Sequence, residues 1–247
     1  MDSNLVILIS CFFLIAVIYS SVGFGGGSSY LALLAVMGVH FEILRPTALL
    51  CNIIVVTGGT FIFWRAGALD LKKCLPFLIA SVPMAFVGGL WKIDDVDLFF
   101  ILLAICLIFA SVLLWIQPPP KKGRKIDHLL LNAGLGAGIG FLSGLVSIGG
   151  GIFLSPILHL LHWDEPKKVS ALASLFILVN SISGLAGQLT RSFTLDWKFV
   201  APLLVAVFLG GQIGSRMGAR KFDPANIKRI TALLILAAGI KILRDHL

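Results

Sequence analysis

Two glycine triplets, each inside an apolar stretch, are the residues whose type and spacing could bind a ligand. Gly25-Gly26-Gly27 interrupts the apolar run 5–39, and Gly149-Gly150-Gly151 interrupts the run 129–163. A glycine inside a helix costs about 1 kcal/mol relative to alanine. Three in succession, at two separate places, therefore predict that each apolar run is broken into two helices at its triplet.

A helix that begins at such a triplet could bind an anion through its backbone. Its first N–H groups have no acceptor within the helix, and its dipole puts partial positive charge at that end. Glycine lets a ligand approach this backbone closely. Two such ends brought together in the membrane would make an anion site without a fixed cationic side chain. Side chains that could add donors are Ser28, Ser29, Ser143, Ser147, Asn52 and Asn180.

The predicted substrate site combines the triplets with the nearest polar side chains. Its members are Gly25, Gly26, Gly27, Ser28, Asn52, Ser147, Gly149, Gly150, Gly151 and Asn180. Each member type has an alternative interpretation. Glycines allow close helix packing in membranes, and a buried amide can simply bond a neighbouring backbone.

Packing explains a second group of glycines better than it explains a consecutive triplet. These glycines are spaced by two and four residues along one apolar run: Gly134, Gly136, Gly138, Gly140 and Gly144.

His159 is the one histidine well inside an apolar segment. It could couple transport to protons, because histidine titrates near neutral pH, but we favour a satisfied core or interfacial histidine.

The composition of the chain is that of a membrane protein. Of its 247 residues, 58% are hydrophobic and 13% are charged, and the mean hydropathy is +1.00. Soluble domains are about 25% charged. Apolar runs recur along the whole length, so we expect a polytopic protein in a lipid bilayer. The net charge of +8 does not indicate nucleic acid, because the basic residues lie in short loops between apolar runs.

The residues that are missing from the apolar runs exclude several functions. All twelve acidic residues fall in termini, loops or helix ends, which weakens a cation substrate and favours an anion. The chain has no nucleotide-binding glycine loop, no nucleophile–base–acid set and no HExxH, so we expect no enzyme activity. The four cysteines form no CxxC pair and lack clustered partners, so we expect no metal and no cofactor.

The second half of the chain repeats the first. The triplets match at an offset of 124 residues, Asn52 matches Asn180 at 128, and Pro76 matches Pro202 at 126. We therefore predict an all-α fold of two internally duplicated repeats, with 8–10 hydrophobic segments and glycine-broken helices. The first membrane repeat would be 1–117, the basic linker loop 118–127 and the second membrane repeat 128–247.

The distribution of Lys and Arg favours inverted repeats. If each half crossed the membrane four times, eleven of the twenty basic residues would lie on one side and nine on the other. If the chain turns back at each triplet, each half makes five passes and the numbers become fourteen and six. The second arrangement obeys the positive-inside rule. The weakness is that the segment 152–163 is short, about 18 Å at 1.5 Å per residue, so it could be a half-helix.

Two prolines predict where helices begin. Proline is tolerated at the first helical position, because its missing N–H would have no intrahelical partner there. Arg45-Pro46 therefore predicts a helix over 47–64, and Pro166 predicts the start of the helix that carries Asn180.

Several motifs resemble those of the sulfite exporter TauE/SafE family. They are Gly23-Phe24-Gly25-Gly26-Gly27, the run GLVSIGGGIFLSP from Gly144 to Pro156, the run 180–184 and the terminal helix 231–243. The resemblance covers essentially the whole chain. It departs from the pattern at Ala32, which stands where the second motif has Pro156.

The resemblance implies a multi-pass permease of a bacterial or archaeal cytoplasmic (inner) membrane that handles small sulfur-containing anions. We therefore expect a secondary transporter that exports a small anion such as sulfite or an organosulfonate. The alternatives are an anion channel or a membrane subunit of a larger transport complex. The expected partners are the small anionic substrate and the lipid bilayer, with a homodimer left open.

Overall fold

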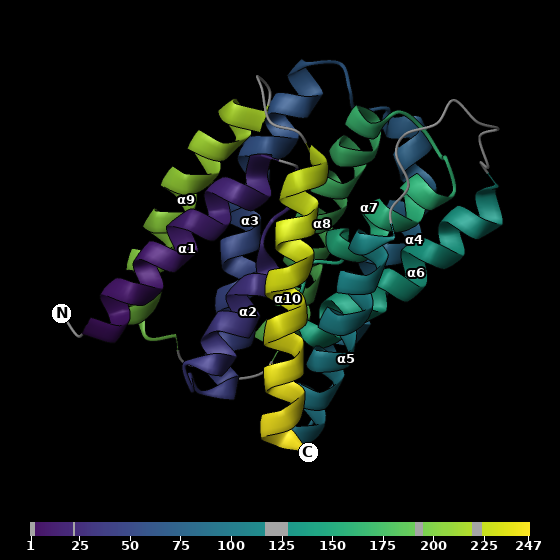
Figure 1. Ribbon diagram of the computed structural model, residues 1–247. Helices are drawn as coiled ribbons and strands as arrows, with labels where there is room; N and C mark the ends of the chain where they lie inside the picture. The colour runs from purple at the N-terminus through teal and green to yellow at the C-terminus, as the bar shows by residue number, and fades with distance from the viewer. Residues whose placement is uncertain (1–2, 22, 117–127, 191–194, 219–223) are drawn as a thin grey trace.

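The described part of the chain folds into helices joined by short connections (Figure 1). The structure is a computed structural model that describes residues 3–21, 23–116, 128–190, 195–218 and 224–247. Its helices are α1 (Ser3–Ser21), α2 (Gly27–Val36), α3 (Phe41–Arg65), α4 (Leu71–Leu90), α5 (Val96–Trp115), α6 (Leu129–Val146), α7 (Gly151–Leu160), α8 (Pro166–Leu189), α9 (Trp197–Gly218) and α10 (Pro224–His246). The all-α fold class is confirmed. The linker 118–127 lies outside the described residues, so the division into two repeats stays a prediction.

Six of these helices are long and apolar enough to cross a membrane: α3, α4, α5, α6, α8 and α9. The chain is thus a multi-pass membrane protein, as predicted. The helices that follow the triplets, α2 and α7, have only 10 residues each. Ten residues span about 15 Å, half of a hydrocarbon core of about 30 Å. Each glycine-broken run is therefore one longer helix followed by a half-helix.

The two halves of the chain interlock rather than lie side by side. The helix α4 of the first half packs along α6 of the second, and α9 of the second half packs along α1 of the first. The helices α5 and α10 pair at the front of Figure 1, while α3 and α8 pack against each other in the interior. This exchange is the pattern that two repeats related by a two-fold axis would produce. The duplication itself stays a prediction.

Glycines on one face of α6 bring it against the backbone of α4. A Cβ added to Gly136, Gly140 or Gly144 would lie 2.4, 2.5 or 2.0 Å from the carbonyl oxygen of Phe77, Ser81 or Ala85, respectively. The spacing of four residues keeps the three glycines on the same helix face. The packing interpretation is confirmed for these glycines. It is wrong for Gly134 and Gly138, which face open space.

The prolines mark one helix start and not the other. Pro166 begins α8, as predicted. The prediction for Pro46 is wrong, because α3 begins at Phe41 and Pro46 lies inside it. Leu44 and Arg45 are buried against the rest of the protein, and this burial stabilises the helical turn before Pro46. The preference of proline for the first helical position does not include such tertiary contacts. Arg45 is therefore part of a buried helix and not of a loop.

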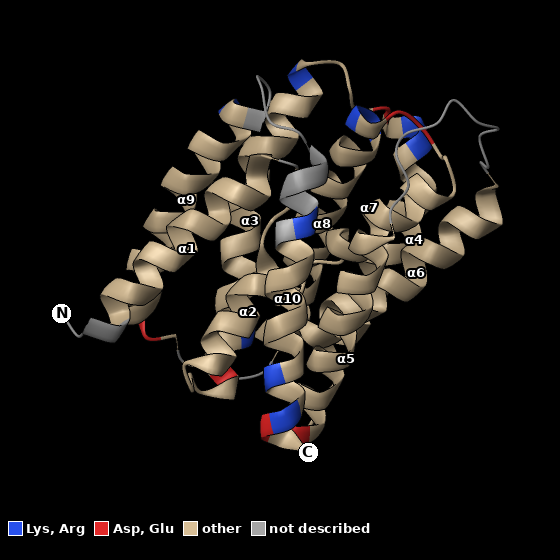
Figure 2. Cartoon of the chain, in the orientation of Figure 1, with Lys and Arg blue, Asp and Glu red and all other residues tan. Residues whose placement is uncertain are grey.

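The charged residues distinguish the two ends of the molecule. Lys and Arg gather at the top of Figure 2, on the end of α3 and the starts of α4 and α8. We call this the basic end. Basic and acidic residues are mixed at the opposite end, where α10 finishes, which we call the terminal end.

At each triplet the chain reverses direction, so that α2 leads back to the terminal end and α7 leads back to the basic end (Figure 1).

Candidate functional site

The helices α2 and α7 begin at the triplets, as the sequence predicted. The residue before α2 is Gly26, with φ of 88°, and the residue before α7 is Gly150, with φ of 79°. These left-handed angles cost glycine nothing but strain any residue with a Cβ. They aim the first N–H groups of both half-helices into the protein interior, where Gly27, Ser28, Gly149 and Gly151 are buried.

The two breaks lie against each other. A Cβ added to Gly27 would lie 2.7 Å from the carbonyl oxygen of Ile148, the residue before the second triplet. The amide of Asn52 on α3 lies between the breaks, and its Nδ2 donates to the Ile148 carbonyl at 3.1 Å. A Cβ on Gly25 or Gly149 would also collide with this amide. Asn52 thus joins the first break to the backbone of the second.

Asn180 lies at the matching level of α8 but bonds differently. The Thr60–Ser174 hydrogen bond of 3.0 Å and the contact of Leu49 with Gly184 show that α3 and α8 run antiparallel. Asn180 therefore lies near the level of Asn52. Its Nδ2 donates to the Phe176 carbonyl of its own helix at 2.8 Å, so the alternative of a backbone-bonded amide holds for this nitrogen.

Several buried oxygens around the breaks have no hydrogen-bond partner in the described part of the chain. They are Asn52 Oδ1, Asn180 Oδ1, Ser143 Oγ and Ser181 Oγ. Ser181 Oγ and Ser143 Cβ lie 3.1 and 3.2 Å from a Cβ added to Gly149 and Gly150, respectively. A buried polar atom without a partner costs about 1–3 kcal/mol. Native proteins keep such groups where a ligand or a water completes them.

Ser147, also predicted in the site, is held by two side chains that sequence reasoning missed. It has a φ of 61° at the end of α6. Its hydroxyl oxygen accepts from Arg45 Nε at 3.3 Å and from Gln188 Nε2 at 2.8 Å. Arg45 and Gln188 belong to α3 and α8, so the central helix pair positions both donors.

The guanidinium of Arg45 is almost fully buried, with 6% of the residue exposed. Its Nη2 donates to the Leu145 carbonyl at 2.9 Å, which satisfies a carbonyl at the end of α6. The rings of Phe41 and Phe99 lie 5.6 and 5.3 Å from the guanidinium carbon. A buried cation therefore lies beside Ser147, two residues before the second triplet, and the substrate site at the triplets stays a prediction. Sequence reasoning missed Arg45 because it placed Arg45 in a loop, and the signal that could have found it is its position between apolar residues.

A cleft opens from the terminal end down to these donors. It has a volume of about 700 Å³, and Arg45 and Gln188 line it. The remaining walls come from the α2–α3 and α4–α5 connections, with His246 of α10. Since Ser147 precedes Ile148 and the second triplet, the cleft approaches the glycine breaks.

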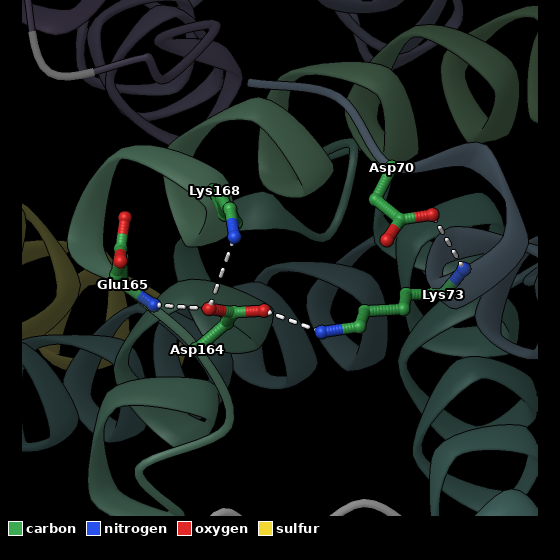
Figure 3. Close-up of polar contacts among 5 residues, drawn as sticks. All are labelled: Asp70, Lys73, Asp164, Glu165 and Lys168. Carbon is green, nitrogen blue, oxygen red and sulfur yellow. Dashed lines mark hydrogen bonds and ion pairs between the residues drawn. The ribbon is translucent and has the colours of Figure 1, made fainter. Parts of the chain in front are cut away.

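An ion cluster joins two elements at the basic end (Figure 3). The side chain of Asp164, in the α7–α8 connection, is completely buried. Its carboxylate accepts from Lys73 Nζ of α4 at 2.8 Å and lies 3.7 Å from Lys168 Nζ of α8. The backbone N–H of Glu165 also donates to it at 2.8 Å. A buried carboxylate held by two ammonium groups links the first half of the chain to the second.

We predict that Asp164→Asn destabilises this link. The substitution leaves two lysines, each about a third exposed, beside a neutral amide, and it removes a hydrogen bond to a charged group that is worth about 1.5–3 kcal/mol. The expected result is a lower melting temperature of the purified protein. The matched control is Asp94→Asn, which removes an ion-pair partner of Lys92 that is exposed and should change stability by less than about 1 kcal/mol. Equal melting temperatures of the two variants would contradict the prediction.

His159 supports the interpretation of a satisfied core histidine. It is 8% exposed, and its Nδ1 lies 2.7 Å from the Ser155 carbonyl one turn earlier in α7. Within the described ranges, no three His, Cys, Asp or Glu side chains are grouped so that they could hold a metal ion.

Comparison with known proteins identifies relatives of the whole chain. A family model described as "Sulfite exporter TauE/SafE" matches residues 8–242. The probable membrane transporter protein y4hK of Sinorhizobium fredii is 30% identical, with 98% of this chain and 100% of that protein covered. The probable membrane transporter protein YunE of Bacillus subtilis is 24% identical, with 98% of each chain covered.

A third relative comes from an archaeon. It is the probable membrane transporter protein MJ0441 of Methanocaldococcus jannaschii, which is 27% identical over 95% of this chain and 93% of its own length. No solved structure matches the chain.

Proposed function

We propose, from the premise that this chain belongs to the sulfite exporter TauE/SafE family, that it exports a small sulfur-containing anion such as sulfite or an organosulfonate. As a member of this family the chain is a membrane transporter and not an enzyme. The substrate class and the direction are those that the name of the family describes. The proposed location is the cytoplasmic (inner) membrane of a bacterium or archaeon.

The observation that carries this proposal is the meeting of the two glycine-headed half-helices beside Asn52. An anion there would accept from the first N–H groups of α2 and α7 and would lie near the positive ends of both helix dipoles. The unpartnered oxygens of Asn52 and Asn180 suit a ligand that brings a donor of its own, such as an acid hydroxyl or a bound water. Paired discontinuous helices of this kind form the binding sites of many secondary transporters.

The two ends of the molecule support alternating access. A cleft opens from the terminal end, and the buried Asp164 cluster ties α4 to the α7–α8 connection at the basic end. By the positive-inside rule the basic end faces the cytoplasm. We propose that the structure is the outward-facing state of two inverted repeats, and that opening of the basic end would separate Lys73 from Asp164.

Transport by reconstituted protein tests the proposal. Purified protein in liposomes should take up sulfite or a sulfonate with saturation, and anion on the opposite side should accelerate the flux. The same anions should raise the melting temperature, because a ligand at one hundred times its Kd stabilises the folded state by about 2.7 kcal/mol. Thiosulfate and simple carboxylates complete the screen.

The alternatives give different results in the same experiment. A channel would conduct without saturation or acceleration by anion on the opposite side. A subunit of a larger complex would be inactive alone and would co-purify with an energy-coupling partner. Either result, or failure of every sulfur oxyanion to bind, would overturn the proposed function.

A further inference from the structure

The cleft at the terminal end has a floor of buried hydrogen-bond donors under a rim of exposed charges. Arg45 and Gln188, at 6% and 7% exposure, line its inner part. Glu42, Lys92 and Asp94 line the cleft and are exposed, and Lys92 pairs with Asp94. Water and salt weaken the electrostatic interactions of exposed charges, whereas a buried guanidinium interacts through a medium of lower dielectric constant. The three rim charges sum to −1, but water and salt screen them, so the buried guanidinium of Arg45 is the cation that an anion at the floor would meet.

The two floor residues converge on one acceptor. Arg45 Nε and Gln188 Nε2 reach the same oxygen, Ser147 Oγ, from two different helices, at 3.3 and 2.8 Å. Donors from separate elements that aim at a single oxygen form a preorganised site for an acceptor atom. An oxygen of a small anion that entered the cleft could replace the Ser147 hydroxyl as their shared acceptor. A guanidinium beside an amide suits an oxyanion with two or more oxygens on one atom.

We propose that Arg45 and Gln188 form an oxyanion-binding site at the floor of this cleft, separate from the glycine breaks and reached from outside the membrane. The inference rests on the proposed function, because it makes this site the outer stage of the same transport path. Ser147 is the connection: its hydroxyl bonds to the floor, and its neighbour Ile148 bonds to Asn52. Displacing the hydroxyl would loosen the end of α6 beside the second break.

Accessibility labelling tests the position and direction of the site. The variant Val39→Cys places a thiol in the cleft wall. A membrane-impermeant maleimide, which reacts with accessible thiols, is added to right-side-out vesicles that contain this variant. The chain without this substitution gives the background from its four native cysteines. We expect labelling from outside that ethanesulfonate, which does not react with maleimide, slows and that chloride does not. Labelling only after the vesicles are inverted would overturn the outward assignment.

Two substitutions test the donors. Arg45→Gln should raise the anion concentration for half-maximal protection by about tenfold to a hundredfold, the value of a hydrogen bond to a charged group. Lys241→Gln, which removes an exposed cation of the same end outside the cleft, should leave protection unchanged. Equal protection in Arg45→Gln and in its parent would refute the site, and the proposed function would stand.

Gln188→Glu separates anion binding from a structural role. A glutamate can still bond the Ser147 hydroxyl and can pair with Arg45, so the melting temperature without ligand should be retained. Its negative charge should nevertheless weaken protection by ethanesulfonate by tenfold or more. Unchanged protection would show that the floor residues only hold α6 in place and would overturn the proposal. If no anion protects any variant and no flux is measured, the proposed function fails together with it.

Discussion

Gly150→Val is expected to abolish anion transport. Gly150 has a φ of 79°, an angle that costs a residue with a Cβ about 1–2 kcal/mol. The added Cβ would also lie 2.9 Å from the ring of Phe176 and 3.0 Å from Ile139. The first turn of α7 must then rotate, which moves the N–H groups that the proposed function assigns to the substrate. Gly26→Val should behave alike, because Gly26 has a φ of 88° and lies against Tyr30.

A third glycine separates the effect of backbone strain from the effect on the site. Gly67, between α3 and α4, has a φ of 65°, and a Cβ added there meets nothing within 4 Å. Gly67→Val therefore carries a similar strain outside the breaks and outside the cleft. The measurement is initial sulfite or sulfonate flux per folded protein in liposomes, with folding checked by size-exclusion chromatography. Full flux in both Gly26→Val and Gly150→Val would show that the glycine breaks do not bind the substrate.

Gly144→Val is expected to give the largest loss of stability. The added Cβ would lie 2.0 Å from the Ala85 carbonyl oxygen. This oxygen belongs to the backbone of α4 and cannot move aside by a side-chain rotation. The helices α4 and α6 must separate, and their long contact joins the two halves of the chain. Overpacking of this kind costs about 1–3 kcal/mol or more.

The same helix supplies the control. Gly138 lies on α6 between the packed glycines, and a Cβ there meets nothing within 4 Å. Gly138→Val changes helix propensity by the same amount without touching α4. Thermal unfolding in detergent should show a clear decrease in melting temperature for Gly144→Val and little change for Gly138→Val. Similar curves for the two variants would mean that the α4–α6 seam does not hold the halves together.

Much of the fold could be predicted because each relevant signal is local. Long apolar runs predict membrane helices, because the backbone N–H and C=O groups of a segment in lipid must form their hydrogen bonds within the helix. Consecutive glycines report helix breaks, because the cost of glycine in a helix is a property of the residue itself. The breaks before α2 and α7 therefore follow from Gly25–Gly27 and Gly149–Gly151 without knowledge of any neighbour.

The errors concern residues whose role depends on a neighbour from elsewhere in the chain. Gly138 and Gly140 are equivalent in sequence, yet only Gly140 meets Ser81. The structure puts Gly140 on the face towards α4 and Gly138 on the opposite face. Similarly, Asn52 and Asn180 match in the sequence alignment of the halves, but Asn52 bonds across to Ile148 and Asn180 bonds within its own helix.

By itself the sequence determined that the chain is a multi-pass helical membrane protein with two helices that begin at glycine triplets. Composition, apolar length and glycine content act within one segment, and these properties depend on little else. Only the tertiary structure decided that the triplets meet at Asn52, that Asp164 lies buried between Lys73 and Lys168, and that Arg45 donates to Ser147 beside the second triplet. Each of these contacts connects residues from different elements, because the antiparallel packing of α3 with α8 and the parallel packing of α4 with α6 set their distances.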